Sequence, residues 1–223
     1  TQLIEQLPSM GWDVHVLVPE IVRWQRQPKI VSTTHTWGTL HKLYRHVHRW
    51  SQAWTDNAAN SALQCWLSTL LPHTIHIHHL NGFPLKWLFN SSAHLHLTLH
   101  DYALPCSRGQ LLDRNLHVCT GPTPIQCQTC IEPWLILERH PQNKLKQRHQ
   151  LTTQLLHSMD RIDAPSFDLI QRFQGFYPTL TIEHCSLPVP PIETYNLNNI
   201  NPRNRSRYHT GHTFLFVGSI HPS

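Results

Sequence analysis

Residues 74–101 read TIHIHHLNGFPLKWLFNSSAHLHLTLHD, with two short apolar runs on either side of a turn. Its short apolar runs predict a β-strand over residues 74–79 and a second over residues 94–99. Asn81-Gly82 marks a turn after the first strand, and Pro84 begins a short helix that ends at Phe89. The stretch therefore predicts two strands joined through a helical connection.

The same alternation continues on both sides of this stretch. The remaining predicted strands span residues 13–19, 161–166, 179–185 and 214–218. The predicted helices span residues 1–10, 40–50, 54–70, 142–159 and 167–176. Residues 20–35 and about 30 residues after Asp101 are expected to be irregular. This order predicts an α/β fold with a doubly wound, mostly parallel sheet, whose ligand binds beyond the carboxyl ends of the strands.

The composition narrows the class of protein. Of the 223 residues, 39% are hydrophobic and 14% charged, and the hydrophobic runs are segmented, which is typical of a globular chain. No run approaches the roughly 18 apolar residues of a membrane span. The formal net charge of +5 favours anionic partners such as nucleotide diphosphates or phospholipid head groups. Lysine and arginine are too scattered to indicate a nucleic-acid partner.

Both ends of the chain are expected to be internal to a longer protein. The chain begins at Thr1 within an apparent helix and ends at Ser223 directly after an apolar strand. We expect one domain over residues 1–185, a linker rich in proline and asparagine over residues 186–212, and the first strand of a second domain over residues 213–223.

Polar side chains follow the two strands of the opening stretch. His78 and His79 end the first strand, and His100-Asp101 follows the second. In a parallel sheet both ends lie at one edge, where imidazoles can bond sugar or phosphate oxygens and move protons near neutral pH. We predict a site there. The other histidines of these strands, His76, His94 and His96, are expected to have no function, because the chain contains 20 histidines.

Four of the six cysteines lie in the long segment after Asp101: Cys106, Cys119, Cys127 and Cys130. A Cys-x-x-Cys pair with two further cysteines can form a four-thiolate zinc site, which would also order the segment. Two disulfides and four free thiols are the alternatives. Cys65 and Cys185 are expected to be small buried apolar residues.

A set of motifs in this order resembles the GT-B glycosyltransferases of family 4. Residues 11–19 are similar to the glycine-to-proline motif around the first strand of that family. Residues 75–82 resemble its V-H-x-H strand, residues 97–102 its T-x-H-D strand end, and residues 164–166 its A-P-S motif. The cysteines resemble an insertion found in a subgroup, and residues 216–222 resemble the opening strand of the second domain.

The resemblance implies the amino-terminal, acceptor-side half of a retaining glycosyltransferase with a Rossmann-like domain. Such an enzyme transfers a sugar from a nucleotide-sugar donor to a glycan, lipid or other cell-envelope acceptor, and it needs no metal for catalysis. It also implies that His100 reaches the donor sugar and that Asp101 lies beside it as the second catalytic residue. The expected substrate-binding residues are His78, His79, Gly82, Arg108 and Gly218.

The chain departs from the family pattern at both ends. The glycine-rich first loop would precede Thr1, and the acidic pair and basic diphosphate-binding residues would follow Ser223, so the chain alone is expected to be inactive. Ser219 stands where many members have arginine. A cytoplasmic enzyme with peripheral contact to the inner face of the plasma membrane is expected. The alternative function is a non-catalytic zinc-binding module built on the four cysteines.

Overall fold

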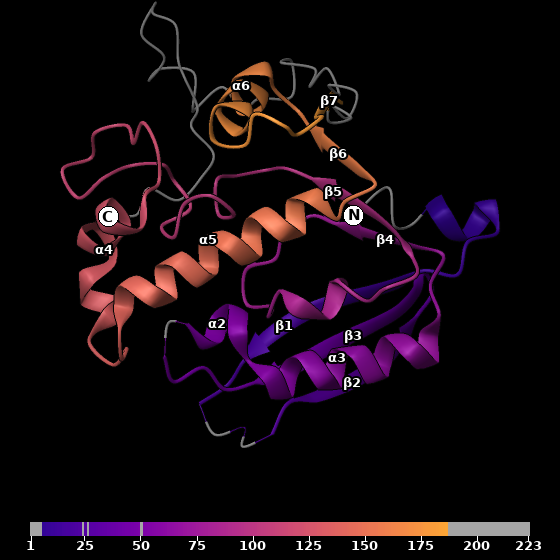
Figure 1. Ribbon diagram of the computed structural model, residues 1–223. Helices are drawn as coiled ribbons and strands as arrows, with labels where there is room; N and C mark the ends of the chain where they lie inside the picture. The colour runs from indigo at the N-terminus through magenta and orange to yellow at the C-terminus, as the bar shows by residue number, and fades with distance from the viewer. Residues whose placement is uncertain (1–5, 24, 26, 50, 187–223) are drawn as a thin grey trace, which may run out of the picture. The chain divides into compact units, whose positions relative to one another are not determined.

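The structure is a computed structural model that describes residues 6–23, 25, 27–49 and 51–186 (Figure 1). The predicted linker and the predicted strand at residues 214–218, which includes Gly218, lie outside the described residues. The strands are β1 (His15–Ile21), β2 (Lys29–His35), β3 (Gly38–Arg45), β4 (Thr74–Ile77), β5 (His94–Thr98), β6 (Arg161–Ala164) and β7 (Glu183–His184). The α-helices are α2 (Gln52–Thr55), α3 (Asn57–Leu70), α4 (Pro124–Ile131), α5 (Pro141–His157) and α6 (Phe167–Phe176). Short 3-10 helices are η1 (Leu7–Met10), η2 (Lys86–Leu88) and η3 (Glu132–Leu135).

The four strands β4 to β7 form an all-parallel sheet in the order β4-β5-β6-β7. Both strands of the opening stretch are therefore confirmed, and so are helices α5 and α6 that connect the later strands. Ile77 lies beside Leu97, and Leu97 beside Ile162, and all three side chains are buried. One face of this sheet is thus apolar, and helices α3, α5 and α6 contribute leucine, isoleucine and phenylalanine side chains to the same core.

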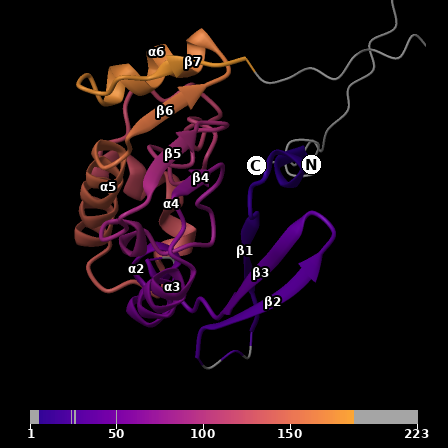
Figure 2. The same ribbon diagram turned by 90° about the vertical axis from the view of Figure 1, so that its right-hand side faces the viewer.

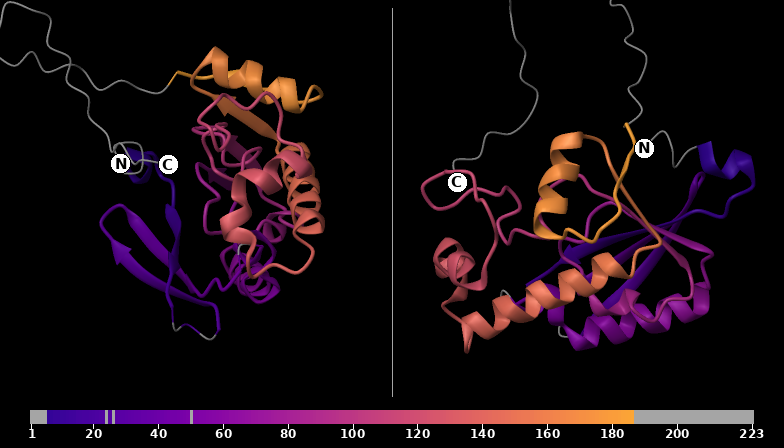
Figure 3. Two further views of the ribbon diagram at one scale, coloured as in Figure 1. Left: turned by 90° about the vertical axis from the view of Figure 1, so that its left-hand side faces the viewer. Right: turned by 45° about the horizontal axis from the view of Figure 1, so that its top comes forward.

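Histidine occupies the opposite face, because successive residues of a strand point to opposite sides of a sheet. His76, His94 and His96 alternate with the buried Ile77, Leu95 and Leu97. The views in Figure 3 show α5 and α6 beside these strands, and α6 packs against β6 and β7. The result is a parallel sheet flanked by helices that is compatible with a Rossmann-like fold.

Strand β1 does not join this sheet, which corrects part of the predicted topology. It pairs in parallel with β3, and β3 pairs antiparallel with β2 to give a separate sheet in the order β1-β3-β2 (Figure 2). Strands β4 to β7 follow one another in chain order, so the order reversal of a doubly wound sheet is not seen among the described residues.

Two predictions for residues 20–50 were wrong. Residues 29–35 form β2 instead of an irregular segment, and residues 38–45 form β3 instead of the start of a helix. Leucines three apart fit a helix, but the buried residues of β3 are His41, Leu43 and Arg45, which follow the period of two of a strand. Gly38 permits the tight connection between the two strands, because it has a φ of +137°.

The segment after Asp101 also contains more structure than expected, since α4 and η3 lie in it. Thr123 caps α4 by accepting a hydrogen bond from the Gln126 amide, and Pro124 occupies the first turn. Thr-Pro-x-Gln is a helix-start signal that was available in the sequence. The predicted helix at residues 167–176 is confirmed as α6, and the Ser166 hydroxyl caps it by accepting a hydrogen bond from the Leu169 amide. No helix within the described residues is long and apolar enough to cross a membrane.

Candidate functional site

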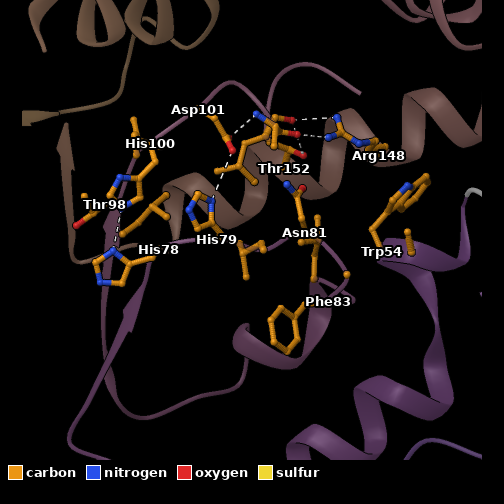
Figure 4. Close-up of a pocket in the computed structure, with 18 residues that line it drawn as sticks. Trp54, His78, His79, Asn81, Phe83, Thr98, His100, Asp101, Arg148 and Thr152 are labelled. Carbon is orange, nitrogen blue, oxygen red and sulfur yellow. Dashed lines mark hydrogen bonds and ion pairs between the residues drawn. The ribbon is translucent and has the colours of Figure 1, made fainter. Parts of the chain in front are cut away.

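The carboxyl ends of β4 and β5 bring together the four polar residues that the sequence singled out there. His78 Nδ1 and His100 Nε2 lie 2.8 Å apart, so one imidazole donates a hydrogen bond to the other. His79 Nδ1 lies 3.5 Å from the Asp101 carboxylate, and the His79 and His100 rings are 5.1 Å apart between centroids. Figure 4 shows these side chains turned toward one another. The expected meeting of both strand ends is therefore observed.

A pocket of about 90 Å³, here called the strand-end pocket, opens beside this cluster. Complete sites for small ligands typically measure roughly 300–1,000 Å³. The strand-end pocket therefore has room for one end of a ligand. Besides the strand-end residues it is lined by Trp54 of α2, Asn81 and Phe83 of the loop after β4, and Arg148 and Thr152 of α5.

Sequence reasoning missed these five lining residues. Nothing in the local sequence marks Trp54, Arg148 or Thr152 as site residues. They reach the pocket only because α2 and α5 come next to the loops that follow β4 and β5. No local pattern indicates such a long-range approach.

Arg148 shapes the wall of the pocket behind Asp101. Its guanidinium donates hydrogen bonds to the carbonyl oxygens of Ala103 and Leu104, as Figure 4 shows. Asp101 itself accepts a hydrogen bond of 2.8 Å from the Ala103 amide. The turn that carries Asp101 is thus held both by its own carboxylate and by the arginine of α5.

Gly82 lies in the pocket wall for a steric reason. Its φ is +85°, which disfavours side chains, and a Cβ atom there would lie 2.9 Å from Cγ of Pro19. Its carbonyl oxygen accepts a hydrogen bond of 3.3 Å from Arg45. Gly82 therefore permits the close approach of the loop after β4 to β1. This structural role is independent of the predicted role of Gly82 in substrate binding.

Arg45 is the side chain that joins this loop to α2. It is fully buried, and it also donates to the carbonyl oxygens of Gln52 and Ala53. An ion pair of 3.6 Å links it to Asp56, the cap of α3. Burial is the main reason that the pKa of Arg45 lies below its ordinary value. Arg45 thus fixes the backbone on two sides of the strand-end pocket.

Helix α2 is held at its start by a second long-range contact. The Glu138 carboxylate accepts hydrogen bonds from the Ser51 amide, at 2.6 Å, and from the Ser51 hydroxyl, at 2.9 Å. Both residues are buried. Since Trp54 lies one turn further along, this contact positions the aromatic side of the pocket.

The imidazoles of His78 and His100 are biased toward their neutral forms. Partial burial, and after it the nearby His100 and His79 rings, lowers the pKa of His78 below its ordinary value, although the residue as a whole is exposed. Burial and His79 likewise lower the pKa of His100, and Asp101 opposes this shift. Neutral imidazoles can both donate and accept hydrogen bonds, which suits a ligand rich in hydroxyl groups.

Two histidines that were expected to be inert extend the cluster along the sheet. The His76 ring stacks on the His96 ring, with centroids 4.1 Å apart, and lies 4.2 Å from the His78 ring. His96 bonds the buried Asp163 at 2.6 Å. We call His76, His78, His79, His96 and His100 the histidine cluster. His94, by contrast, is exposed, and its Nδ1 atom lies 3.9 Å from the Asp160 carboxylate.

Other predicted site residues lie elsewhere. Arg108 donates to the Asp113 carbonyl within the segment after Asp101 and does not line the strand-end pocket, so the structure does not bring it to the predicted substrate site. The six cysteines, all within the described residues, are free thiols. Cys65 and Cys185 are exposed, which corrects the expectation that they are buried.

The geometry of the described residues offers a hydroxyl-binding edge but no ready-made metal site. No group of three or more His, Cys, Asp or Glu side chains among them is placed to hold a metal ion. Comparison with protein-family models, with curated proteins and with solved structures gives no match.

Proposed function

We propose that this chain is the acceptor-side domain of a retaining glycosyltransferase, which transfers a sugar from a nucleotide-sugar donor to a glycan, lipid or other cell-envelope acceptor. The observation that carries the proposal is the His78–His100 pair beside Asp101 at the carboxyl edge of a parallel sheet. Parallel α/β sheets bind their ligands at this edge.

The chemistry of the strand-end pocket supports a carbohydrate ligand. Neutral imidazoles and the Asp101 carboxylate can bond hydroxyl groups as donors and acceptors. Trp54 and Phe83, each only 5% exposed, line the pocket with apolar atoms. The pocket size suits one sugar unit better than a whole sugar nucleotide, as expected if the donor is bound mainly by a second domain.

Within this proposal His100 is the group that touches the transferred sugar, and Asp101 bonds a hydroxyl group beside it. His78 acts through His100, because their hydrogen bond occupies Nε2 of His100 and leaves Nδ1 for a ligand. The leaving diphosphate would be stabilised by basic side chains and helix amides of the donor domain.

The test is a transfer assay on the full gene product with a panel of nucleotide sugars and cell-envelope glycan and lipid acceptors. We expect transfer by the wild type and a loss of about 10²–10⁴-fold in kcat/KM for His100→Ala, the range for a positioned group that acts on the reacting centre. His94→Ala is the matched control, since it removes an exposed histidine from the start of β5, the strand that His100 follows.

Two outcomes would contradict the proposal. One is the absence of transfer or donor hydrolysis with every nucleotide sugar. The other is an equal, small effect of His100→Ala and His94→Ala. Circular dichroism of both variants separates a lost contact from a lost fold.

A further inference from the structure

A line of four polar side chains lies on the sheet β1-β3-β2 (Figure 2), and none of them lines the strand-end pocket. Oγ of Ser32 lies 2.8 Å from Nδ1 of His41, and Nε2 of His41 lies 2.9 Å from Nδ1 of His15. Nε2 of His15 in turn lies 3.1 Å from the Asp13 carboxylate. We call Ser32, His41, His15 and Asp13 the serine relay.

The strand register places three members of the serine relay on one face of the sheet. Ser32 of β2 and Leu17 of β1 are both paired with His41 of β3, so the three side chains share a face. His15 precedes Leu17 by two residues and therefore lies on the same face. Asp13 follows in the segment that leads into β1.

The pairing of Ser32 also directs its backbone toward the open edge of the sheet. The Thr39 amide donates to the Val14 carbonyl just before β1, so every second residue of β3, His41 included, turns its amide toward β1. Ser32 therefore faces His41 in a non-hydrogen-bonded pair, where side chains lie closest. Its own amide points away from β3, at the edge strand of the described sheet, and the residue is exposed.

His41 is the buried member of the serine relay. It is 5% exposed, and the Trp66 ring of α3 meets it edge-on with centroids 4.9 Å apart. Burial, and after it His15, lowers the pKa of His41 below its ordinary value, so this imidazole is neutral near pH 7. A neutral imidazole has one acceptor nitrogen that can take a proton.

The carboxylate of Asp13 sets the direction in which the protons point. A carboxylate has no proton to give, so the proton of a neutral His15 lies on Nε2, which faces Asp13. Nδ1 of His15 then accepts from Nε2 of His41, and Nδ1 of His41 accepts the hydroxyl proton of Ser32. The Ser32 hydroxyl therefore points at a basic nitrogen, which is the arrangement that activates serine as a nucleophile.

We propose that Ser32 is the nucleophile of an acyl-transfer site that takes a carboxylic ester, with His41 as its general base and His15 and Asp13 as positioning residues. The inference does not depend on sugar transfer, because the serine relay and the strand-end pocket have no residue in common.

The reaction consists of two displacements at the ester carbonyl carbon. Oγ of Ser32 attacks this carbon, and its proton passes to Nδ1 of His41. The bond to the alcohol oxygen breaks, and His41 gives the proton to that oxygen. A water molecule then attacks the acyl group on Ser32 with His41 again taking and returning the proton, so ester and water give acid and alcohol. The Ser32 amide is a donor for the negative oxygen that forms in each step.

The first test uses a biotinylated fluorophosphonate on the full chain. Its phosphorus bonds the oxygen of an activated serine, and fluoride leaves. Peptide mass spectrometry should find the adduct on Ser32 at least about 10-fold above that on Ser61, an exposed serine of α3. Ser32→Ala should remove the adduct. Thr33→Ala is the matched control, because Thr33 is exposed on the opposite face of β2 and should leave the labelling unchanged.

The second test measures hydrolysis of p-nitrophenyl acetate. Histidines also attack this ester, so the activity of the serine relay is the rate of the wild type minus that of Ser32→Ala. We expect His41→Gln to lower the kcat/KM of this activity about 10²–10⁴-fold, the range for a general base. Circular dichroism shows whether each variant is folded.

The positioning part has its own readout. Asp13→Asn removes the charge that fixes the His15 tautomer, so kcat should fall while KM stays unchanged. Asp13→Glu keeps the charge and should restore most of kcat. If the two variants behave alike, the positioning role of Asp13 is refuted.

Two results would overturn the nucleophile assignment. One is labelling of Ser32 no stronger than that of Ser61 in the wild type. The other is equal ester hydrolysis by the wild type and Ser32→Ala.

Discussion

Replacing Arg45 with methionine removes the donor that joins β3, α2 and the loop after β4. The carbonyl oxygens of Gln52, Ala53 and Gly82 lose a partner, and Asp56 loses its ion pair. Methionine keeps much of the side-chain volume, so the change reports on these polar contacts and not on a large cavity.

The magnitude follows from two opposing contributions. Hydrogen bonds from a charged donor contribute about 1.5–3 kcal/mol each, so three of them favour the folded state by several kcal/mol. Removal of the buried charge also removes its desolvation penalty, which offsets part of this loss. Asp56 remains partly exposed and still caps α3, so its carboxylate keeps a hydrogen-bond partner in the variant. We expect a net loss of about 2–4 kcal/mol in the free energy of unfolding.

Urea unfolding followed by tryptophan fluorescence measures this loss, and thermal unfolding should show a fall in Tm of about 4–16 °C for a domain of this size. Arg49→Met is the matched control, because Arg49 is exposed four residues further along and its loss should cost no more than about 0.5 kcal/mol. If Arg45→Met is as stable as Arg49→Met, the buried guanidinium does not stabilise the folded state, and the reasoning is refuted.

The remaining predictions concern the histidine cluster and the pocket loop. Burial, and then repulsion from His78 and His96, lower the pKa of His76 to about 4, below the value of 6.5 in an unfolded chain. The folded state therefore binds fewer protons than the unfolded state, and the free energy of unfolding should fall as the pH drops from about 6.5 toward 4. The fall should be smaller than the full linkage value, because the His76 ring is partly exposed. Urea unfolding at about pH 7.5 and about pH 5 measures this fall, and an equal fall in the His76→Thr variant would contradict the prediction. Gly82→Ala should destabilise the protein by about 1–3 kcal/mol, because the φ of +85° at Gly82 and its approach to Pro19 exclude a side chain. Gly175→Ala should instead stabilise it by about 0.5–1 kcal/mol, because Gly175 is helical and no atom lies within 4 Å of the added Cβ. Thermal unfolding compares the two variants, and equal shifts in Tm would contradict the prediction.

The alternating pattern of the sequence determined where the parallel sheet would form. Strands were predicted at residues 74–79 and 94–99, and they form over Thr74–Ile77 and His94–Thr98, where Ile75 and Ile77, and Leu95 and Leu97, occupy every second position. Ser166 before a helical pattern indicated the start of α6, because a cap is a local interaction. The strand ends also followed from the sequence, since a parallel sheet has one carboxyl edge and His78, His79, His100 and Asp101 must gather there.

Only the tertiary structure decided which strands share a sheet and which distant residues complete the pocket. Leu40 and Leu43 fit a helix as well as a strand in the sequence, and residues 38–45 form a strand because β3 pairs with β1 and β2. Backbone hydrogen bonds between distant segments leave no local pattern, so the sequence could not predict this pairing. No local pattern marks Arg45 or Arg148, and their roles arise from carbonyl oxygens that other segments bring to them. Helix caps and strand periodicity depend on neighbouring residues and can be predicted from the sequence, whereas contacts between remote segments depend on how the whole domain packs.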